Sequence, residues 1–433
     1  MKTLTFFLTL CLSLTLIAGC TGTPATPSSL PAATNPPPAS TNTPQPPTPA
    51  STTTLLPPQA QAQLTPTPTC NFTDAQVQAT ETAVVAPQPK PEWIFAAGNA
   101  ILSPATVVDG VIYFGSDDGT LYAVNLSTHD LKWKYQTGGA VRSQPAVDLT
   151  LVYAASDDSD LYAISKSDGT LAWKSQIERS PIQRSSSDMT SAWDWYTSSP
   201  VLQDTTLYIG STDGNLYALD TQTGKTLWKF DTTASIRTTP LVANGLVYIG
   251  NTLGDYFAID AKVGTEVWNY STKEGNSSNG MALVDNIVYF VSSTNFHALE
   301  AKTGAVKWTR SMGPGSNFKP VSENGILYAD GYDESGCYRP VGAYDAGTGK
   351  LVWVPNFFLT DMLLTSVTIG QNSVYFGADH EGLYALDKKT GEIKWKLVVS
   401  GAQGSGVNAN ATVADGMVYF GGMDGKLYAV KDQ

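Results

Sequence analysis

The stretch Ala218–Trp228, ALDTQTGKTLW, contains the unit that decides the fold. An apolar strand end leads into Asp220, Thr223 and Gly224, and a second short strand then ends at Trp228. Asp and Thr side chains hydrogen-bond the backbone of tight turns, and glycine supplies the positive φ that such turns require. The stretch therefore predicts a β-hairpin that ends in a tryptophan.

The same unit recurs along the chain. Its close copies are Ala258–Trp268, Ala298–Trp308, Ala343–Trp353 and Ala385–Trp395, and its weaker copies are Ala123–Trp133 and Ala163–Trp173. With one more tryptophan upstream, the repeat tryptophans are Trp93, Trp133, Trp173, Trp228, Trp268, Trp308, Trp353 and Trp395. Most of them lie about 40 residues apart, a period that is typical of one four-stranded propeller blade. We expect these tryptophans to pack between blades.

The two ends of the repeat region are incomplete in a complementary way. The last pair of central strands, which ends at Leu427–Val430, is not followed by a tryptophan, and Trp93 is not preceded by such a pair. A strand around Trp93 that completes the last blade would close the ring and leave no open terminal blade. The sequence thus predicts an all-β fold, an eight-bladed β-propeller of four-stranded antiparallel blades closed by the N-terminal strand.

The first residues have the layout of a secretory signal. Lys2 precedes an apolar run from Leu4 to Ile17, which is short for a membrane-spanning helix. The run ends in the sequence Ile-Ala-Gly-Cys, which resembles a bacterial lipobox, and this resemblance implies cleavage before Cys20 and lipid on its thiol. The alternative is an ordinary signal peptide with a chance cysteine. We expect an exported, membrane-anchored lipoprotein, on the periplasmic face or the cell surface.

Residues 20–90 are rich in Pro, Thr, Ser and Ala. Runs such as Pro36-Pro37-Pro38 cannot pack a core and favour extended polyproline II, so we expect a disordered tether. The expected organisation is a signal peptide at 1–19, a lipidated tether at 20–90 and a propeller at 91–433. Export permits a disulfide between Cys70 and Cys337, and the alternative is two unpaired thiols.

The formal net charge of −12 argues against a general affinity for nucleic acid or for anionic membrane surfaces. Membrane contact is therefore expected only through the N-terminal lipid. We expect the propeller head to be monomeric.

The A-x-D-x-x-T-G-x-x-x-W units resemble the tryptophan-docking repeats of quinoprotein-like (PQQ-repeat) eight-bladed propellers, from about Trp93 to Gln433. Within that family, an exported lipoprotein without another domain is similar to the BamB-type propellers of outer-membrane protein assembly. The resemblance implies a non-catalytic scaffold that binds other envelope proteins.

A resemblance to quinoprotein dehydrogenases would instead imply an adjacent cysteine pair over the cofactor, a calcium site and a catalytic Asp. The sequence has no adjacent cysteine pair, and His129, His297 and His380 share no predicted site with a nucleophile or carboxylate. We therefore expect no cofactor and no catalysis. Two other functions stay open, a sensor that binds a saccharide or small anion, and a quinoprotein-type dehydrogenase.

The strand order predicts that the turns between second and third strands share one face with the connections between blades. These connections converge on the central channel, where partners are expected because loops carry function on a rigid frame. The longest connection, Gln176–Ser199, is either a plug over the channel or a recognition loop with exposed aromatics. The candidate residues of this interaction face are Arg142, Arg179, Arg184, Trp193, Trp195, Tyr196, Arg237 and Lys319.

Arg142, Arg237 and Lys319 would stand at the start of innermost strands, at the channel mouth. In one interpretation, these cations are solvated or pair with neighbouring acids such as Asp188. In the other, they form a small cationic site for an anionic group.

The carboxylates of the sequence predict no catalytic or metal site. A calcium-binding interpretation of Asp330, Asp333 and Glu334, in the insertion Asp330–Pro340, is weak because their spacing fits no twelve-residue loop. The repeated turn aspartates lie on the opposite face and in different blades, and we expect them to be structural: Asp220, Asp260, Asp345 and Asp387.

Overall fold

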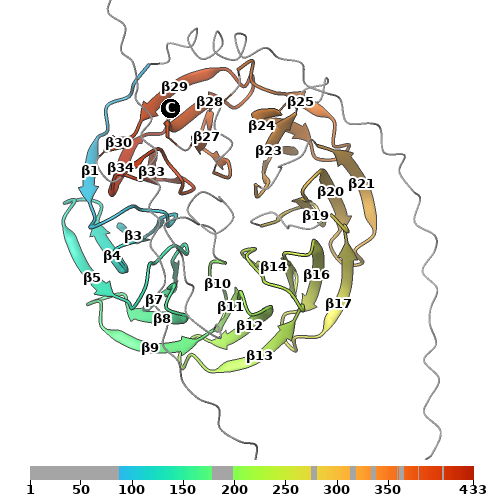
Figure 1. The fold of residues 1–433 in the computed structure, drawn as a ribbon, viewed down its shortest axis with the longest axis horizontal. Coiled ribbons are helices and arrows are strands. Elements are labelled where there is room, and N and C mark those ends of the chain that lie inside the picture. The colour runs from blue at the N-terminus through green and yellow to red at the C-terminus, as the bar shows by residue number, and fades with distance from the viewer. Residues whose placement is uncertain are drawn as a thin grey trace, which may run out of the picture. The chain divides into compact units, whose positions relative to one another are not determined.

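The computed structural model describes residues 87–177, 198–274, 280–312, 318–332, 338–357, 359, 365–378, 380–401 and 404–433. Two compact units are distinguished, residues 1–60 and 61–433, and all described residues belong to the second. These residues form strands and turns, and none of them belongs to a helix that could cross a membrane. Figure 1 shows the strands as a closed ring of small sheets, one blade after another.

Seven blades consist of four strands that follow one another in the chain, with the first strand innermost and the fourth at the rim (Figure 1). Blade one consists of β2 (Thr106–Val108), β3 (Val111–Gly115), β4 (Thr120–Asn125) and β5 (Leu131–Gln136). Blade two consists of β6 (Ala146–Val147), β7 (Leu151–Ala155), β8 (Asp160–Ser165) and β9 (Leu171–Gln176). Blade three consists of β10 (Val201–Gln203), β11 (Thr206–Gly210), β12 (Asn215–Asp220) and β13 (Thr226–Asp231). Blades four and five are β14 (Leu241–Ala243), β15 (Leu246–Gly250), β16 (Asp255–Asp260) and β17 (Glu266–Ser271); and β18 (Ala282–Val284), β19 (Ile287–Val291), β20 (Asn295–Glu300) and β21 (Val306–Ser311). Blades six and seven are β22 (Val321–Glu323), β23 (Ile326–Tyr332), β24 (Tyr338–Asp345) and β25 (Leu351–Trp353); and β26 (Thr368–Ile369), β27 (Ser373–Ala378), β28 (Gly382–Asp387) and β29 (Ile393–Val398).

The eighth blade joins the two ends of the propeller. It contains β32 (Thr412–Ala414), β33 (Met417–Gly421), β34 (Lys426–Lys431) and, at its rim, β1 (Trp93–Ala96). β1 runs antiparallel to β34, with Trp93 opposite Ala429. The predicted all-β, eight-bladed ring, closed by the strand around Trp93, is therefore confirmed. A short hairpin of β30 (Ser400–Gly401) and β31 (Gly404–Ser405) lies between blades seven and eight in sequence.

Apolar side chains of the central strands pack between neighbouring blades. The layer between blades four and five, for example, contains Tyr248 and Trp268 from one blade and Phe290 and Leu299 from the next, all buried. Equivalent layers occur around the ring. Because no blade buries both of its faces alone, each blade depends on its neighbours for stability.

A shared backbone acceptor joins five successive pairs of blades, from blades two and three to blades six and seven, while at the junction of blades one and two the tryptophan is the only aromatic donor, with Trp133 Nε1 bound to the carbonyl of Lys166. The carbonyl of Ala301 accepts a hydrogen bond from Trp268 Nε1 at 2.8 Å and another from the Tyr248 hydroxyl at 3.1 Å. Both donors belong to blade four, and Ala301 begins the turn between the third and fourth strands of blade five. The same double contact is made to the carbonyls of Thr221, Ala261, Ala346 and Lys388.

The glycine of the Thr-Gly turn is required by the same contact. A Cβ atom on Gly224 would lie 2.4 Å from Cε3 of Trp173, and its φ of +68° disfavours any L side chain. Trp228, Trp268, Trp308 and Trp353 cover the glycines of the following blades in the same way. The repeated T-G-x-x-x-W pattern therefore describes two halves of one contact, in which a glycine receives the indole of the preceding blade.

Two positions at the join of the ring depart from this pattern. In blade one the glycine is replaced by His129, which has a φ of 63° and stacks on Trp93 with ring centroids 4.8 Å apart. Trp395 of blade seven is the other exception among the described residues, because its buried Nε1 has no hydrogen-bond partner. In blade eight the rim strand is β1, which no turn joins to β34, so the Thr-Gly turn has no counterpart between these two strands.

We predict that the closing strand contributes strongly to stability. A propeller that starts at Ala97 lacks β1, so the edge of β34 is open and the packing of Trp93 is lost. Loss of a packed tryptophan lowers the free energy of unfolding by about 3–5 kcal/mol. Thermal unfolding of heads that start at Pro87 and at Ala97 measures the effect, and equal melting temperatures would show that the ring does not depend on β1.

We further predict that Gly224→Ala destabilises the protein more than Gly245→Ala. Both glycines have positive φ, but a Cβ on Gly245 would have no atom within 4 Å. The control should lose about 1–2 kcal/mol from the backbone conformation alone. Gly224→Ala should lose about 2–3 kcal/mol more, because Trp173 must move. Urea unfolding measures both, and similar losses would mean that the indole contact is not tight.

Candidate functional site

The turns between the second and third strands of each blade meet the connections that lead into the innermost strands. Asp117 in the first such turn donates its N–H to the carbonyl of Ala100, and Asp157 in the second donates its N–H to the carbonyl of Ala140, both at 2.9 Å. These turns and connections therefore share one end of the propeller, as the strand order predicts. With the four strands of a blade lettered a to d from the channel outward, we call this end, which carries the turns between strands b and c, the b–c face.

A hydrogen-bonded ring of polar residues lies at the base of this face. Its members stand two residues before the innermost strand of each blade, and four of them donate their backbone N–H to the side chain of the member in the next blade. Gln144 N donates to Ser199 Oγ at 2.9 Å, and Ser199 N donates to Thr239 Oγ1 at 3.2 Å. Lys319 N donates to Ser366 Oγ at 3.1 Å, and Ser366 N donates to Asn410 Oδ1 at 2.9 Å. We call the eight positions the inner ring: Pro104, Gln144, Ser199, Thr239, Gly280, Lys319, Ser366 and Asn410.

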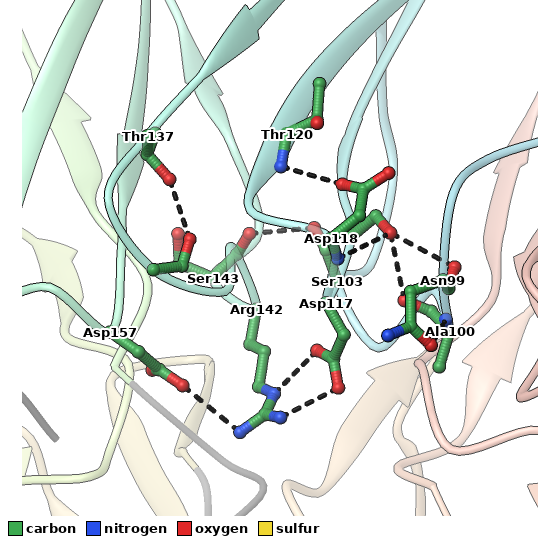
Figure 2. Close-up of polar contacts among 12 residues, drawn as sticks. Asn99, Ala100, Ser103, Asp117, Asp118, Thr120, Thr137, Arg142, Ser143 and Asp157 are labelled. Atoms are coloured by element: carbon green, nitrogen blue, oxygen red, sulfur yellow. Dashed lines mark hydrogen bonds and ion pairs between the residues drawn. The ribbon is translucent and has the colours of Figure 1, made fainter. Parts of the chain in front are cut away.

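Arg142 lies just before the inner ring and joins two blades (Figure 2). Its Nε and Nη2 donate to the two carboxylate oxygens of Asp117, each at 2.7 Å, and its Nη1 donates to Asp157 at 3.1 Å. Asp117 comes from blade one and Asp157 from blade two. All three side chains are about nine-tenths buried, so the cluster is a bidentate ion pair with a second carboxylate beside it.

The two carboxylates determine the charge state of this cluster. Burial opposes the charge on the guanidinium, but the hydrogen bond with Asp117 and the negative charges of Asp117 and Asp157 outweigh it and raise the pKa of Arg142. Arg142 is thus a paired cation with all of its charge compensated. Of the two interpretations of this residue, pairing with acids describes it, with Asp117 and Asp157 as the partners, and Asp188 lies outside the described residues.

The sequence itself carries a signal for these two partners. The triplet Ser-Asp-Asp occurs at 116–118 and again at 156–158, in equivalent turns of blades one and two. The second aspartate of each triplet accepts hydrogen bonds within its own blade, for example from Tyr122 and from the N–H of Thr120. The first aspartate is thereby left for Arg142.

Arg237 occupies the position of Arg142 in blade four. It lines a small pocket on the b–c face together with Asp157, Ser198 and Thr212, so that blades two, three and four all contribute. Arg142 and Arg237 therefore lie on the same side of the ring, where the connection between blades two and three begins and ends.

Lys319 differs from both arginines. It is partly buried, burial lowers the pKa of its ammonium, and no carboxylate of the described residues pairs with it. Its place is on the inner ring in blade six, away from Arg142 and Arg237. The structure therefore does not unite the three predicted cations in one site.

The remaining predicted site residues lie outside the described residues: Cys20, Cys70, Arg179, Arg184, Trp193, Trp195, Tyr196 and Cys337. Asp333 and Glu334 also lie outside them. The turn aspartates are described: Asp220 accepts hydrogen bonds from the N–H and the hydroxyl of Thr223, at 2.9 and 2.7 Å, and the Thr223 hydroxyl contact lowers the pKa of Asp220. This is the structural role expected for them.

The donor set does not fit a quinone with its calcium ion. Within the described ranges no three His, Cys, Asp or Glu side chains are grouped as metal ligands. The carboxylates of Asp117 and Asp157 are committed to Arg142. The sequence also has no adjacent cysteine pair to lie over a quinone ring. We therefore derive no step that uses such a cofactor.

We predict that Arg142→Met destabilises the propeller, because it removes the bidentate partner of the buried Asp117 and the ion pair with Asp157. Removing one partner of a buried ion pair costs about 3–5 kcal/mol. The triple variant Arg142→Met, Asp117→Asn, Asp157→Asn should recover much of this loss. Urea unfolding at neutral pH measures each variant, and an unchanged midpoint for Arg142→Met would contradict a structural role for the cluster.

Two proteins of known function align with part of this chain. The quinoprotein alcohol dehydrogenase PedH of Pseudomonas putida is 29% identical over 124 residues, which cover 27% of this chain and 20% of that protein. The outer membrane protein assembly factor BamB of Yersinia pestis is 29% identical over 126 residues, which cover 27% of this chain and 30% of that protein. The matched part is thus less than a third of either relative.

Solved structures resemble the propeller over a larger part of the chain. The structure of BamB from Moraxella catarrhalis has a TM-score of 0.63 at 16% identity and covers 79% of this chain and 99% of that one. Quinohemoprotein alcohol dehydrogenase from Comamonas testosteroni has a TM-score of 0.62 at 14% identity and covers 78% of this chain and 76% of that one. At these identities the likeness establishes the fold alone.

The family itself is established by sequence. The sequence profile described as "Outer membrane protein assembly factor BamB" matches residues 82–199, 183–337 and 297–433, which together include every strand of the propeller. The repeats that resemble those of PQQ-type propellers are the repeats of this family. The chain therefore belongs to the family of the outer membrane protein assembly factor BamB.

Proposed function

We propose that this protein is a non-catalytic, exported scaffold, anchored by lipid on Cys20, that binds envelope proteins through the b–c face during outer-membrane protein assembly. The observation that carries the proposal is the family match, which runs from residue 82 to residue 433. The relative from Yersinia pestis is named as an assembly factor. A closed propeller with buried polar side chains that are hydrogen-bonded to one another is suited to be a rigid platform, with the binding residues on its loops.

The b–c face also carries an exposed apolar side chain. Leu253 stands in the turn between β15 and β16 on the b–c face and is 56% exposed. The long connection of residues 176–199, with Trp193 and Trp195, begins and ends on the same face. Exposed aromatic and aliphatic side chains beside charged groups are the usual anchors of protein interfaces.

The dehydrogenase alternative has weaker support. The alignment with the alcohol dehydrogenase covers only 20% of that protein. The described residues do not fit a quinone with calcium, and Arg142 is held by two carboxylates. We therefore propose a binding role without catalysis.

Site-specific photo-crosslinking tests the scaffold role and its face together. We predict that a photoreactive residue at position 253 of the full-length protein captures a component of outer-membrane protein assembly from intact cells, identified by mass spectrometry. The matched control is position 263 in the same blade. Val263 is 58% exposed but stands in the turn between β16 and β17, at the opposite end.

A double variant tests whether the connection of residues 176–199 contributes to binding of the envelope protein. Trp193→Ala with Trp195→Ala should reduce capture from position 253 and leave the melting temperature nearly unchanged. Capture from position 263 but not from position 253 would place the interface on the other face. Capture of no envelope protein from either position would overturn the scaffold role.

A further inference from the structure

The inner ring is interrupted where blade five contributes Gly280. By the pattern of the four contacts described above, the N–H of Thr239 would donate to a side chain at position 280, and glycine has none. Thr239 accepts from Ser199 through its hydroxyl, but its own N–H has no hydrogen-bond partner among the described residues. The ring therefore lacks an acceptor at this point.

Lys319 of blade six lies over the same gap. A Cβ atom built on Gly280 would be 3.0 Å from Cδ and 3.2 Å from Cγ of Lys319, so the lysine stem occupies the place of the missing side chain. An ammonium group has three donors and no acceptor. Lys319 thus fills the space at position 280 but cannot accept the N–H of Thr239.

The charge of Lys319 is also uncompensated among the described residues. Its backbone N–H is bound to Ser366, but its Nζ makes no hydrogen bond or ion pair there. Burial alone lowers the pKa of this ammonium, and no carboxylate acts against that effect. Arg142, in contrast, has two carboxylates as partners. A partly buried cation without a counterion is costly unless an anion joins it.

We propose that Lys319, where the inner ring is interrupted beside Gly280, binds a carboxylate group, which pairs with Lys319 Nζ and accepts the N–H of Thr239. A carboxylate has two acceptor oxygens, so one can face the ammonium while the other faces the backbone donor. The carboxylate belongs either to a small organic acid or to the C-terminus of a peptide. The site does not depend on the scaffold role.

The other interruption of the ring shows what distinguishes this gap. Pro104 has no side-chain acceptor for the N–H of Asn410, but its neighbours on the inner ring, Asn410 and Gln144, carry no charge. The carbonyl of the adjacent Ala105 accepts Nε2 of Gln144 at 3.1 Å and the Thr412 hydroxyl at 2.7 Å, which joins blades eight, one and two. Only the gap at Gly280 combines a missing acceptor with a cation among the described inner-ring residues.

NMR of the full-length protein with ¹³C-methylated lysines tests the proposal with sodium acetate as the probe. We expect the Lys319 signal, assigned from its loss in Lys319→Met, to shift saturably with acetate and its pKa to rise on binding. Sodium chloride at equal ionic strength should not produce the saturable shift. Thermal shift measures the affinity for acetate of the parent and of Lys319→Met. Because a hydrogen bond to a charged group contributes substantially to the free energy of binding, Lys319→Met should weaken acetate binding roughly tenfold or more.

Gly280→Ser is the second variant, because it removes the site by supplying the missing acceptor. A serine hydroxyl at position 280 can accept the N–H of Thr239, and its Cβ would press on Cδ and Cγ of the Lys319 stem. We expect a folded protein that has lost the acetate effect. Lys302→Met is the control, since Lys302 is exposed in a turn at the opposite end. This control should bind acetate as the parent does.

Peptides distinguish the two sources of the carboxylate. Tighter binding of a peptide with a free C-terminus than of its amidated form would assign the site to a peptide terminus. Equal failure of both peptides, with acetate still bound, would assign it to a small acid. The proposal is overturned if acetate shifts the Lys319 signal no more than chloride does, or if Gly280→Ser binds acetate as the parent does.

Discussion

From blade two to blade seven, each blade is held to the next by two side-chain donors that share one backbone carbonyl. A tryptophan Nε1 and a tyrosine hydroxyl from one blade reach the first residue of the Thr-Gly turn in the following blade, as at Ala301 and Ala346. The indole must lie flat on the glycine of that turn, so the glycine, the turn and the tryptophan depend on one another. Because these contacts cross between blades, an isolated blade has neither the donors nor the acceptor complete.

The join of the ring is where this constraint cannot be met in the usual way. β1 supplies the rim strand of blade eight from the other end of the propeller, and Trp93 then stacks on His129 in place of a glycine. The segment before β1 also contacts blade seven, since the carbonyl of Pro87 accepts the N–H of Lys396 in β29 at 3.1 Å. The two ends are thus tied through backbone pairing and ring stacking, while Trp395 keeps an unpaired Nε1.

The rigid frame explains the polar arrangement of the b–c face. Innermost strands are short, and the residues before them are positioned by N–H groups that donate from blade to blade around the inner ring. One departure from the repeat, Arg142, is neutralised by Asp117 and Asp157 and joins two blades. The other departure, Lys319 beside Gly280, has no such partner among the described residues. Arg142 therefore has a structural role, whereas Lys319 is the cation for which we propose a ligand.

The sequence alone determined the number of blades, their strand order and the closure through Trp93, because the turn chemistry and the aromatic docking are local and are repeated about every 40 residues. It also placed Arg142, Arg237 and Lys319 at the starts of innermost strands. Only the tertiary structure decided what those cations do. The partners of Arg142 lie in turns of two different blades, and the space for Lys319 is created by the absence of a side chain at Gly280. Such contacts depend on how neighbouring blades are placed around the ring. The spacing of residues within one repeat does not predict that placement.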